Sequence, residues 1–118
     1  MRELDARIAE GLGYEVEVKR SHTSCYERYY RATKGIKVLL AHYSTDPAAM
    51  LELDEEMRKR GYCKSVFIYD DGHKDVKYWN SNKPIEKRYG TARGKKTQQH
   101  LSCLAAHKAL YGTEWEGA

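Results

Sequence analysis

The spacing of apolar residues changes several times along the first third of the chain. Apolar residues recur every four positions from Leu4 to Leu12, which predicts a short helix that glycines terminate. Apolar and charged residues alternate over residues 14–19, which predicts a strand with one buried face. Residues 21–34 are rich in tyrosine and charge, and we expect a strand-loop-strand connection there. Residues 36–43 predict a further strand.

The clearest signals in the sequence belong to a helix over residues 46–60. Asp46 precedes a proline, which holds it in the extended conformation that a helix cap needs. Pro47 suits the first turn because its missing N–H has no helical partner there. Gly61 supplies a left-handed residue after the last turn.

The second half of the chain predicts a hairpin followed by a closing helix. Residues 62–69 and 76–79 are rich in strand formers and flank the turn sequence Asp70-Asp71-Gly72. The remaining elements that we expect are an edge strand over residues 85–89, a basic glycine loop over 90–96 and a helix over 97–111. This order predicts a single domain over residues 1–118 of the α+β class, with an antiparallel β-sheet covered by helices on both faces (an α/β/α sandwich).

Positive charge is concentrated in two short segments. Residues 19–37 and residues 83–96 each contain six basic residues and one acid, so each has a net charge of +5 while the whole chain has +4. Tyrosines lie among these charges, namely Tyr26, Tyr29, Tyr30 and Tyr89. Cationic groups beside aromatic faces suit a ligand that carries both phosphate and a base. Two solvated basic loops would give the same pattern, so this alternative stays open.

Length and composition exclude several classes of protein. A chain of 118 residues forms one domain with a modest core, and no apolar run approaches the roughly 18 residues of a membrane span. Residues 1–5 carry acids where a secretory signal is apolar, so we expect a cytoplasmic location. Cys25, Cys63 and Cys103 are widely spaced and odd in number, which predicts free thiols, and we expect Cys103 to be buried in the packing of the last helix.

Residues 43–49, Tyr-Ser-Thr-Asp-Pro-Ala-Ala, lead into a helix that ends Arg60-Gly61-Tyr62. This combination resembles the phage ABA-sandwich domain family, small proteins of tailed phages and prophages. The opening at residues 2–6, the hairpin at 69–72 and the alanine-rich last helix with its Cys103 are similar to the same family.

The resemblance implies a helix/sheet/helix fold, a viral origin and therefore a location in the host cytoplasm. It implies no catalytic residues. The chain departs from the family in residues 21–34 and 83–96, which look longer and more basic than the usual hairpins. If a function was added to a shared fold, these departures are where we expect it.

The stretch Gly90-Thr-Ala-Arg-Gly-Lys-Lys-Thr97 lies between a predicted strand and a helix start, as phosphate loops do. A nucleotidase loop needs four residues between its glycines and a single lysine before Ser or Thr, whereas this chain has three residues and two lysines. A weaker hypothesis remains, in which the helix start together with Arg93, Lys95 and Lys96 holds one phosphate.

Two motifs, His22-x-x-Cys25 and His100-x-x-Cys103-x-x-x-His107, contain zinc-ligand types at suitable spacings. A four-ligand site would require the first motif to reach the last helix, which nothing in the sequence indicates. We therefore expect no metal and no cofactor. No Gly-x-Ser-x-Gly elbow is present, and Asp70-Asp71 suit a turn better than an acid–base pair, so we do not expect an enzyme.

These observations predict a small non-enzymatic phage accessory protein of counter-defence, which sequesters a phosphate-bearing, nucleotide-type signal molecule. Two alternatives stay open. One is an anti-CRISPR protein that inhibits a nuclease effector by binding it directly, and the other is a nucleic-acid-binding accessory protein. The expected partner is thus a phosphate-bearing small molecule, a host defence protein or nucleic acid, but no membrane. A protein that sequesters a signal molecule in this way is called a sponge below. A homo-oligomer is compatible with a sponge, since ligand pockets often form between protomers.

The predicted ligand-binding residues come from both basic segments and are Arg28, Arg31, Tyr26, Tyr30, Tyr89, Arg93, Lys95, Lys96 and Thr97. We expect the arginines and lysines to contact phosphate and a tyrosine to stack on a base. They form one site only if the strand before the last helix pairs near residues 25–37. If the segments lie on opposite faces, the sponge hypothesis fails. The effector inhibitor then leads, with the acidic remainder of the surface as its contact.

Overall fold

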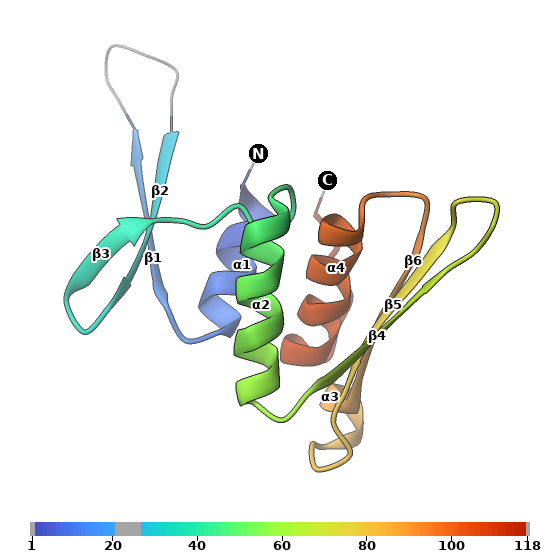
Figure 1. The fold of residues 1–118 in the computed structure, drawn as a ribbon. Helices are drawn as coiled ribbons and strands as arrows, with labels where there is room; N and C mark the ends of the chain where they lie inside the picture. Colours follow the sequence, from blue (N-terminus) through green and yellow to red (C-terminus); the bar gives the residue numbers. More distant parts are fainter. Residues whose placement is uncertain (1, 21–26, 118) are drawn as a thin grey trace.

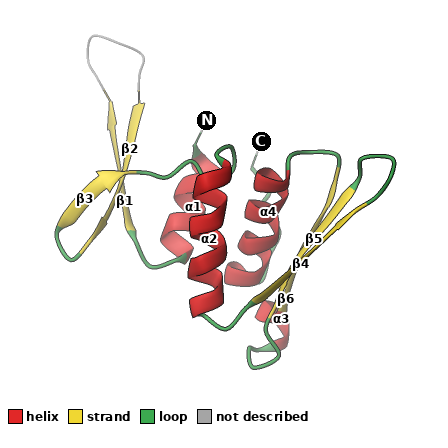
Figure 2. Cartoon of the chain, in the orientation of Figure 1, coloured by secondary structure: helices red, strands yellow, loops and turns green. Residues whose placement is uncertain are grey.

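The structure is a computed structural model that describes residues 2–20 and 27–117, in which four helices and two antiparallel sheets are found (Figures 1 and 2). Sheet A has the order β1-β2-β3 and sheet B the order β4-β5-β6. The elements in chain order are α1 (Glu3–Gly11), β1 (Glu15–Arg20), β2 (Glu27–Thr33), β3 (Ile36–Leu39), α2 (Pro47–Lys59), β4 (Cys63–Ile68), β5 (Lys74–Trp79), α3 (Ile85–Arg88), β6 (Tyr89–Gly94) and α4 (Gln98–Tyr111).

The helices α1, α2 and α4 lie between the two sheets (Figure 1). Sheet B packs on α4, whereas sheet A touches α1 and projects away from the body of the protein. The α+β class and the antiparallel strands are confirmed. The prediction that residues 36–43 and the hairpin around Gly72 share one sheet is wrong, because each sheet is a local meander and α2 separates the two in the chain.

Two predictions in the second half of the chain are also wrong. Residues 85–88 form the short helix α3 instead of an edge strand, and residues 89–94 form the strand β6 instead of a glycine loop. The inward positions of β6 are Gly90, Ala92 and Gly94, which pair with the inward residues of β5. Because these inward residues are so small, β6 shows none of the apolar alternation that marks a strand.

Small residues on α4 allow sheet B to pack closely against this helix. Ala105, Ala106 and Ala109 are fully buried, as are Val76 and Tyr78 on the facing strand β5. The predicted burial of Cys103 in the last helix is confirmed, whereas Cys25 lies outside the described residues.

The predicted helix starts are confirmed by side-chain caps. The Asp46 carboxylate accepts a hydrogen bond from the backbone N–H of Ala48 at 3.0 Å, and Pro47 occupies the first turn of α2. In α4 the Thr97 hydroxyl accepts from the N–H of His100 at 3.2 Å. Gly61, with φ of +89°, follows α2 in the left-handed conformation expected from the sequence.

Candidate ligand-binding surfaces

The outer face of sheet A, which points away from the helices, carries part of the first basic segment. Arg28 and Tyr30 alternate along β2 on this face, and Lys19 pairs with Arg28 from β1. The Nζ atoms of Lys19 and Lys37 lie 5.6 and 6.0 Å from the centroid of the Tyr30 ring. Lys37 also forms an ion pair with Glu17. Tyr30 is therefore flanked by cations, so this half of the predicted site places basic side chains beside an aromatic ring.

Arg31 lies on the opposite side of β2 and faces the helices. Its guanidinium bonds to Glu52 at 2.6 Å and donates to the Tyr43 hydroxyl at 2.5 Å. It also lies 4.8 Å from the centroid of Tyr14. Burial is the largest single influence on Arg31 and lowers its pKa, but the hydrogen bond with Glu52 and the charge interactions with Tyr43, Glu52 and Tyr14 together outweigh it. The pKa of Arg31 is therefore raised. We therefore remove Arg31 from the predicted site, because this internal network occupies its side chain.

The second basic segment forms the end of β6 and the start of α4. Arg93 lies on the outer face of β6, while Lys95 and Lys96 are exposed in the connection to α4. The Lys96 carbonyl accepts from Lys74 at 3.3 Å. The Thr97 hydroxyl caps the helix, so its predicted contact with phosphate would compete with this cap.

The outer face of sheet B carries the predicted Tyr89 and two further aromatic residues, Phe67 and Trp79, that were not predicted from the sequence. Trp79 pairs directly with Tyr89, and Phe67 lies in the same row of the sheet as Asp75 and Arg93. The Nζ atom of Lys77 lies 4.6 Å from the centroid of Tyr89. A cavity of about 610 Å³ opens on this face. It is lined by Ser65, Phe67, Asp75, Val76, Lys77, Thr91, Ala92, Arg93 and Glu114.

A polar cluster lies at one end of this cavity. Asp75 accepts two hydrogen bonds from Arg93, one of them at 3.0 Å, and a third from the Tyr69 hydroxyl at 2.8 Å. The hydrogen bonds from Arg93 and then from Tyr69 lower the pKa of Asp75, so this carboxylate is charged at neutral pH. A phosphate that binds Arg93 must therefore share its guanidinium with Asp75.

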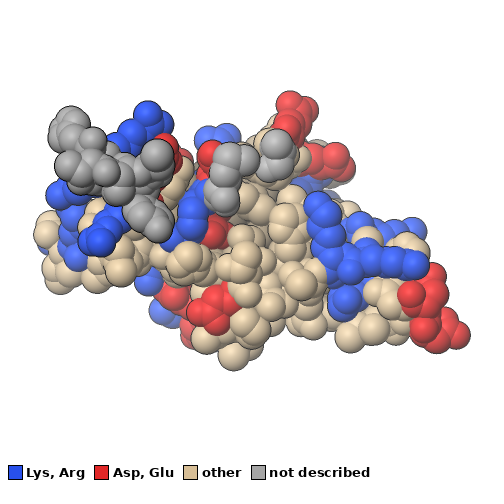
Figure 3. Space-filling model, turned by 90° about the horizontal axis from the view of Figure 1, so that it is seen from above, with Lys and Arg blue, Asp and Glu red and all other residues tan. Residues whose placement is uncertain are grey.

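The two basic segments do not meet in one site. β6 pairs with β5 alone and not with a strand of sheet A, so the predicted pairing near residues 25–37 is wrong. The helices lie between the two sheets (Figure 1), and the molecule is 46 Å long. Figure 3 shows Lys and Arg gathered over sheet A at one end and over sheet B at the other. Tyr26, also predicted for this site, lies outside the described residues.

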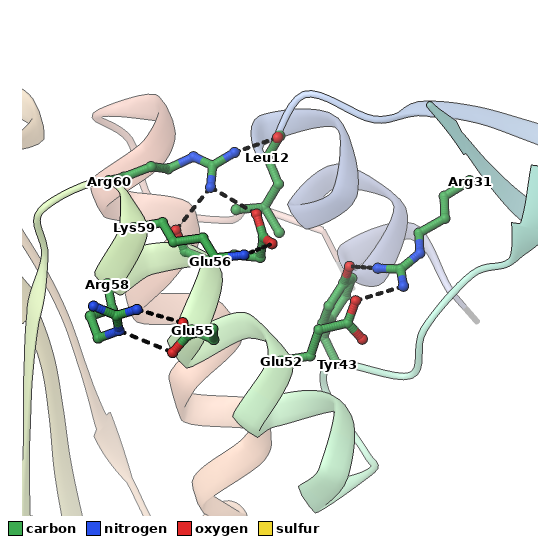
Figure 4. Close-up of polar contacts among 9 residues, drawn as sticks. All are labelled: Leu12, Arg31, Tyr43, Glu52, Glu55, Glu56, Arg58, Lys59 and Arg60. Atoms are coloured by element: carbon green, nitrogen blue, oxygen red, sulfur yellow. Dashed lines mark hydrogen bonds and ion pairs between the residues drawn. The ribbon is translucent and has the colours of Figure 1, made fainter. Parts of the chain in front are cut away.

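The acidic side chains of α2 are largely engaged with neighbouring cations (Figure 4). Glu52 pairs with Arg31, and Glu55 pairs with Arg58 at 2.6 Å. Glu56 pairs with Arg60 at 3.0 Å and with Lys59 at 3.6 Å. This helix therefore offers no concentrated negative surface to a basic partner.

The zinc hypothesis involves three residues of α4 and two residues outside the described chain. In the described ranges 2–20 and 27–117, no three His, Cys, Asp or Glu side chains are grouped in a way that could hold a metal ion. His107 is 3% exposed, and its Nδ1 bonds to the Thr113 carbonyl at 2.8 Å. Its ring packs against Tyr111 and Trp115. His107 thus belongs to the packing of the C-terminal segment, while His22 and Cys25 lie outside the described residues.

Comparisons of the chain with protein-family profiles, curated proteins and solved structures found no match. The resemblance to the phage ABA-sandwich family therefore stays a prediction. Within the described residues, every helix is too short or too polar to cross a membrane.

Proposed function

We propose that this chain is a non-catalytic nucleic-acid-binding protein that holds its ligand mainly by phosphate contacts in two basic regions, which lie on opposite sides of its helices. The observation that carries this proposal is the separation of the two basic segments. The outer face of sheet A holds Lys19, Arg28 and Lys37, and the segment before α4 holds Lys95 and Lys96.

The size of the molecule distinguishes between the candidate ligands. The helices lie between the two basic regions, so a mononucleotide is too small to touch both of them. A nucleic acid places a phosphate about every 3.4 Å along each strand, so a single strand of several nucleotides can contact both regions. The form of the sponge hypothesis that needs both segments in one site is therefore abandoned. Of the two alternatives, the nucleic-acid-binding protein now leads.

The effector inhibitor is less well supported by the same surface. That hypothesis relies on the acidic remainder of the protein as its contact, and the acids of α2 are paired with Arg31, with Lys64 of β4 or with the cations at the end of the helix. The counter-defence role depends on the resemblance to phage proteins and stays a prediction. Binding of nucleic acid does not depend on it.

The experiment is a titration of single-stranded and duplex oligonucleotides over a series of salt concentrations. We expect the logarithm of the association constant to fall linearly with the logarithm of salt, because bound cations release counterions. Two double variants each reverse the charge of one basic region. They are Lys19→Glu with Arg28→Glu on sheet A, and Arg93→Glu with Lys96→Glu before α4. Each should weaken binding and reduce the salt slope by roughly one per lost contact, with the melting temperature nearly unchanged.

The matched control is Lys59→Glu, a charge reversal at the exposed end of α2 and outside both basic segments. It should leave the affinity within about two-fold of the parent. Absence of binding to any oligonucleotide, together with co-elution with a host effector, would overturn the proposal in favour of direct protein inhibition.

A further inference from the structure

The outer face of sheet B exposes three large aromatic side chains although the inner face already supplies the packing on α4. Phe67 is 66% exposed, Tyr89 49% and Trp79 39%. The inner residues Val76 and Tyr78 are fully buried. Packing on α4 therefore does not account for the outer rings, and several large aromatic side chains exposed on one face of a sheet indicate a binding surface.

The register of the strands arranges this face in three rows. One outer row holds Trp79 and Tyr89, and in the other row Asp75 lies between Phe67 and Arg93. Between them lies a polar row formed by Ser65, Lys77 and Thr91. Successive rows are two residues apart along a strand, so the two aromatic rows are separated by about 13 Å.

This alternation of aromatic and cationic rows matches an unpaired nucleic-acid strand. Bases have flat faces that stack on aromatic rings, and the phosphates between them favour a nearby cation. Lys77 lies in the middle row, within 4.6 Å of the Tyr89 ring centroid, where it can reach a phosphate between two stacked bases. The cavity of about 610 Å³ on the same face has the size of a small-ligand site.

A second copy of the chain is the competing occupant of this face. In a two-fold symmetric pair each residue on the axis meets its own copy, so the central Lys77 side chains would be brought close together. Like charges in close contact are unfavourable, whereas the same lysine is complementary to a phosphate. The face is also continuous with the basic segment before α4 through Arg93.

We infer that the outer face of sheet B binds unpaired bases, with stacking on Trp79, Tyr89 and Phe67 and a phosphate held by Lys77. The protein then prefers single-stranded nucleic acid to duplex. This inference rests on the proposed function and specifies its ligand. Asp75 and Glu114 also line the cavity and restrict how closely phosphates approach, so the preference comes from stacking more than from charge.

The test uses the tryptophan fluorescence of the intact protein and a short oligothymidylate. Trp79 lies on the proposed face, whereas Trp115 packs against His107 at a centroid distance of 5.5 Å. We expect the oligonucleotide to quench the parent and the Trp115→Phe variant but not the Trp79→Phe variant. Trp79→Ala should weaken single-strand binding by at least about five-fold and leave duplex binding unchanged.

Controls separate stacking from folding and from surface hydrophobicity. Ile85→Ala removes an exposed apolar side chain from α3 and should leave single-strand affinity unchanged. Circular dichroism of Trp79→Ala should match the parent, and Trp79→Phe, which keeps a ring, should retain most of the affinity.

The possible outcomes distinguish failure of this inference from failure of the proposed nucleic-acid binding. If neither single strands nor duplex bind, the proposed function fails. If both bind equally and Trp79→Ala changes neither affinity, the phosphate contacts stand and the stacking inference is overturned. If sedimentation shows a dimer that Trp79→Ala dissociates, a second copy covers the face, which also overturns the inference.

Discussion

Gly90 in β6 lies so close to α4 that a Cβ atom at this position would come within 2.0 Å of the Ala105 carbonyl oxygen. The same atom would lie 2.7 Å from the backbone nitrogen of Ala109. Gly90 is therefore required where a strand of sheet B packs on the backbone of the helix. The alanines of α4 have the same role from the opposite side.

The first prediction follows from this contact. Gly90→Ala should lower the free energy of unfolding by about 3 kcal/mol, because the clash is with backbone and neither element can move away alone. Urea unfolding measures the change. Thr91→Ala is the control on the exposed face of the same strand and should cost less than about 1 kcal/mol. Equal stability of the two variants would contradict the close packing of β6 on α4.

The cap of α2 gives the second prediction. Asp46→Ala removes the acceptor of the Ala48 N–H and should destabilise the protein by about 1 kcal/mol. Asp46→Ser keeps an oxygen that can accept the same hydrogen bond, so it should recover most of the loss. A thermal melt of the two variants beside the parent distinguishes the cap from the charge of the aspartate.

Arg31 and Arg28 lie on opposite faces of the same strand, which gives the third prediction. Arg31→Met leaves Glu52 and the Tyr43 hydroxyl without their donor and should cost about 2 kcal/mol of stability. Its affinity for oligonucleotides should stay near that of the parent. Arg28→Met should change stability by less than about 0.5 kcal/mol and weaken binding. If Arg31→Met weakens oligonucleotide binding and Arg28→Met does not, Arg31 belongs to the ligand site after all.

The fourth prediction concerns stability at mildly acidic pH. Burial, and then the nearby charge of Arg7, lower the pKa of His107 below the ordinary value of 6.5, although the bond to Thr113 opposes this. The unfolded chain therefore takes up the proton first as pH falls. His107 stabilises the fold fully above about pH 6.5 and loses that contribution as pH falls toward its folded pKa.

The free energy of unfolding should therefore decrease between about pH 7.5 and pH 5.5. His107→Gln should flatten this dependence, although the variant is less stable overall. A smaller slope should remain from His100, whose pKa is also lowered by burial and by Lys96. An unchanged slope in His107→Gln would show that other groups control the dependence.

Local sequence signals were sufficient to predict most of the helices, strands and turns. The cap at Asp46, the left-handed Gly61 and the turn at Asp70-Asp71-Gly72 act over a few residues, so their signals are visible without tertiary contacts. The burial of Cys103 also followed from the small, apolar character of the last helix. The α+β class follows from the order of these elements.

The tertiary structure decided the pairing of the strands and the location of the binding surfaces. β6 could not be recognised in the sequence because its inward residues, Gly90, Ala92 and Gly94, are small, and at Gly90 the backbone of α4 leaves no room for a side chain. Arg31 and Arg28 are indistinguishable as basic residues, yet the alternation of β2 turns one inward to Glu52 and the other outward. Trp79 meets Tyr89 only because β5 and β6 adopt this register after the intervening helix α3, and the register is fixed by how both strands pack on α4 and not by the hydrophobic pattern of either strand.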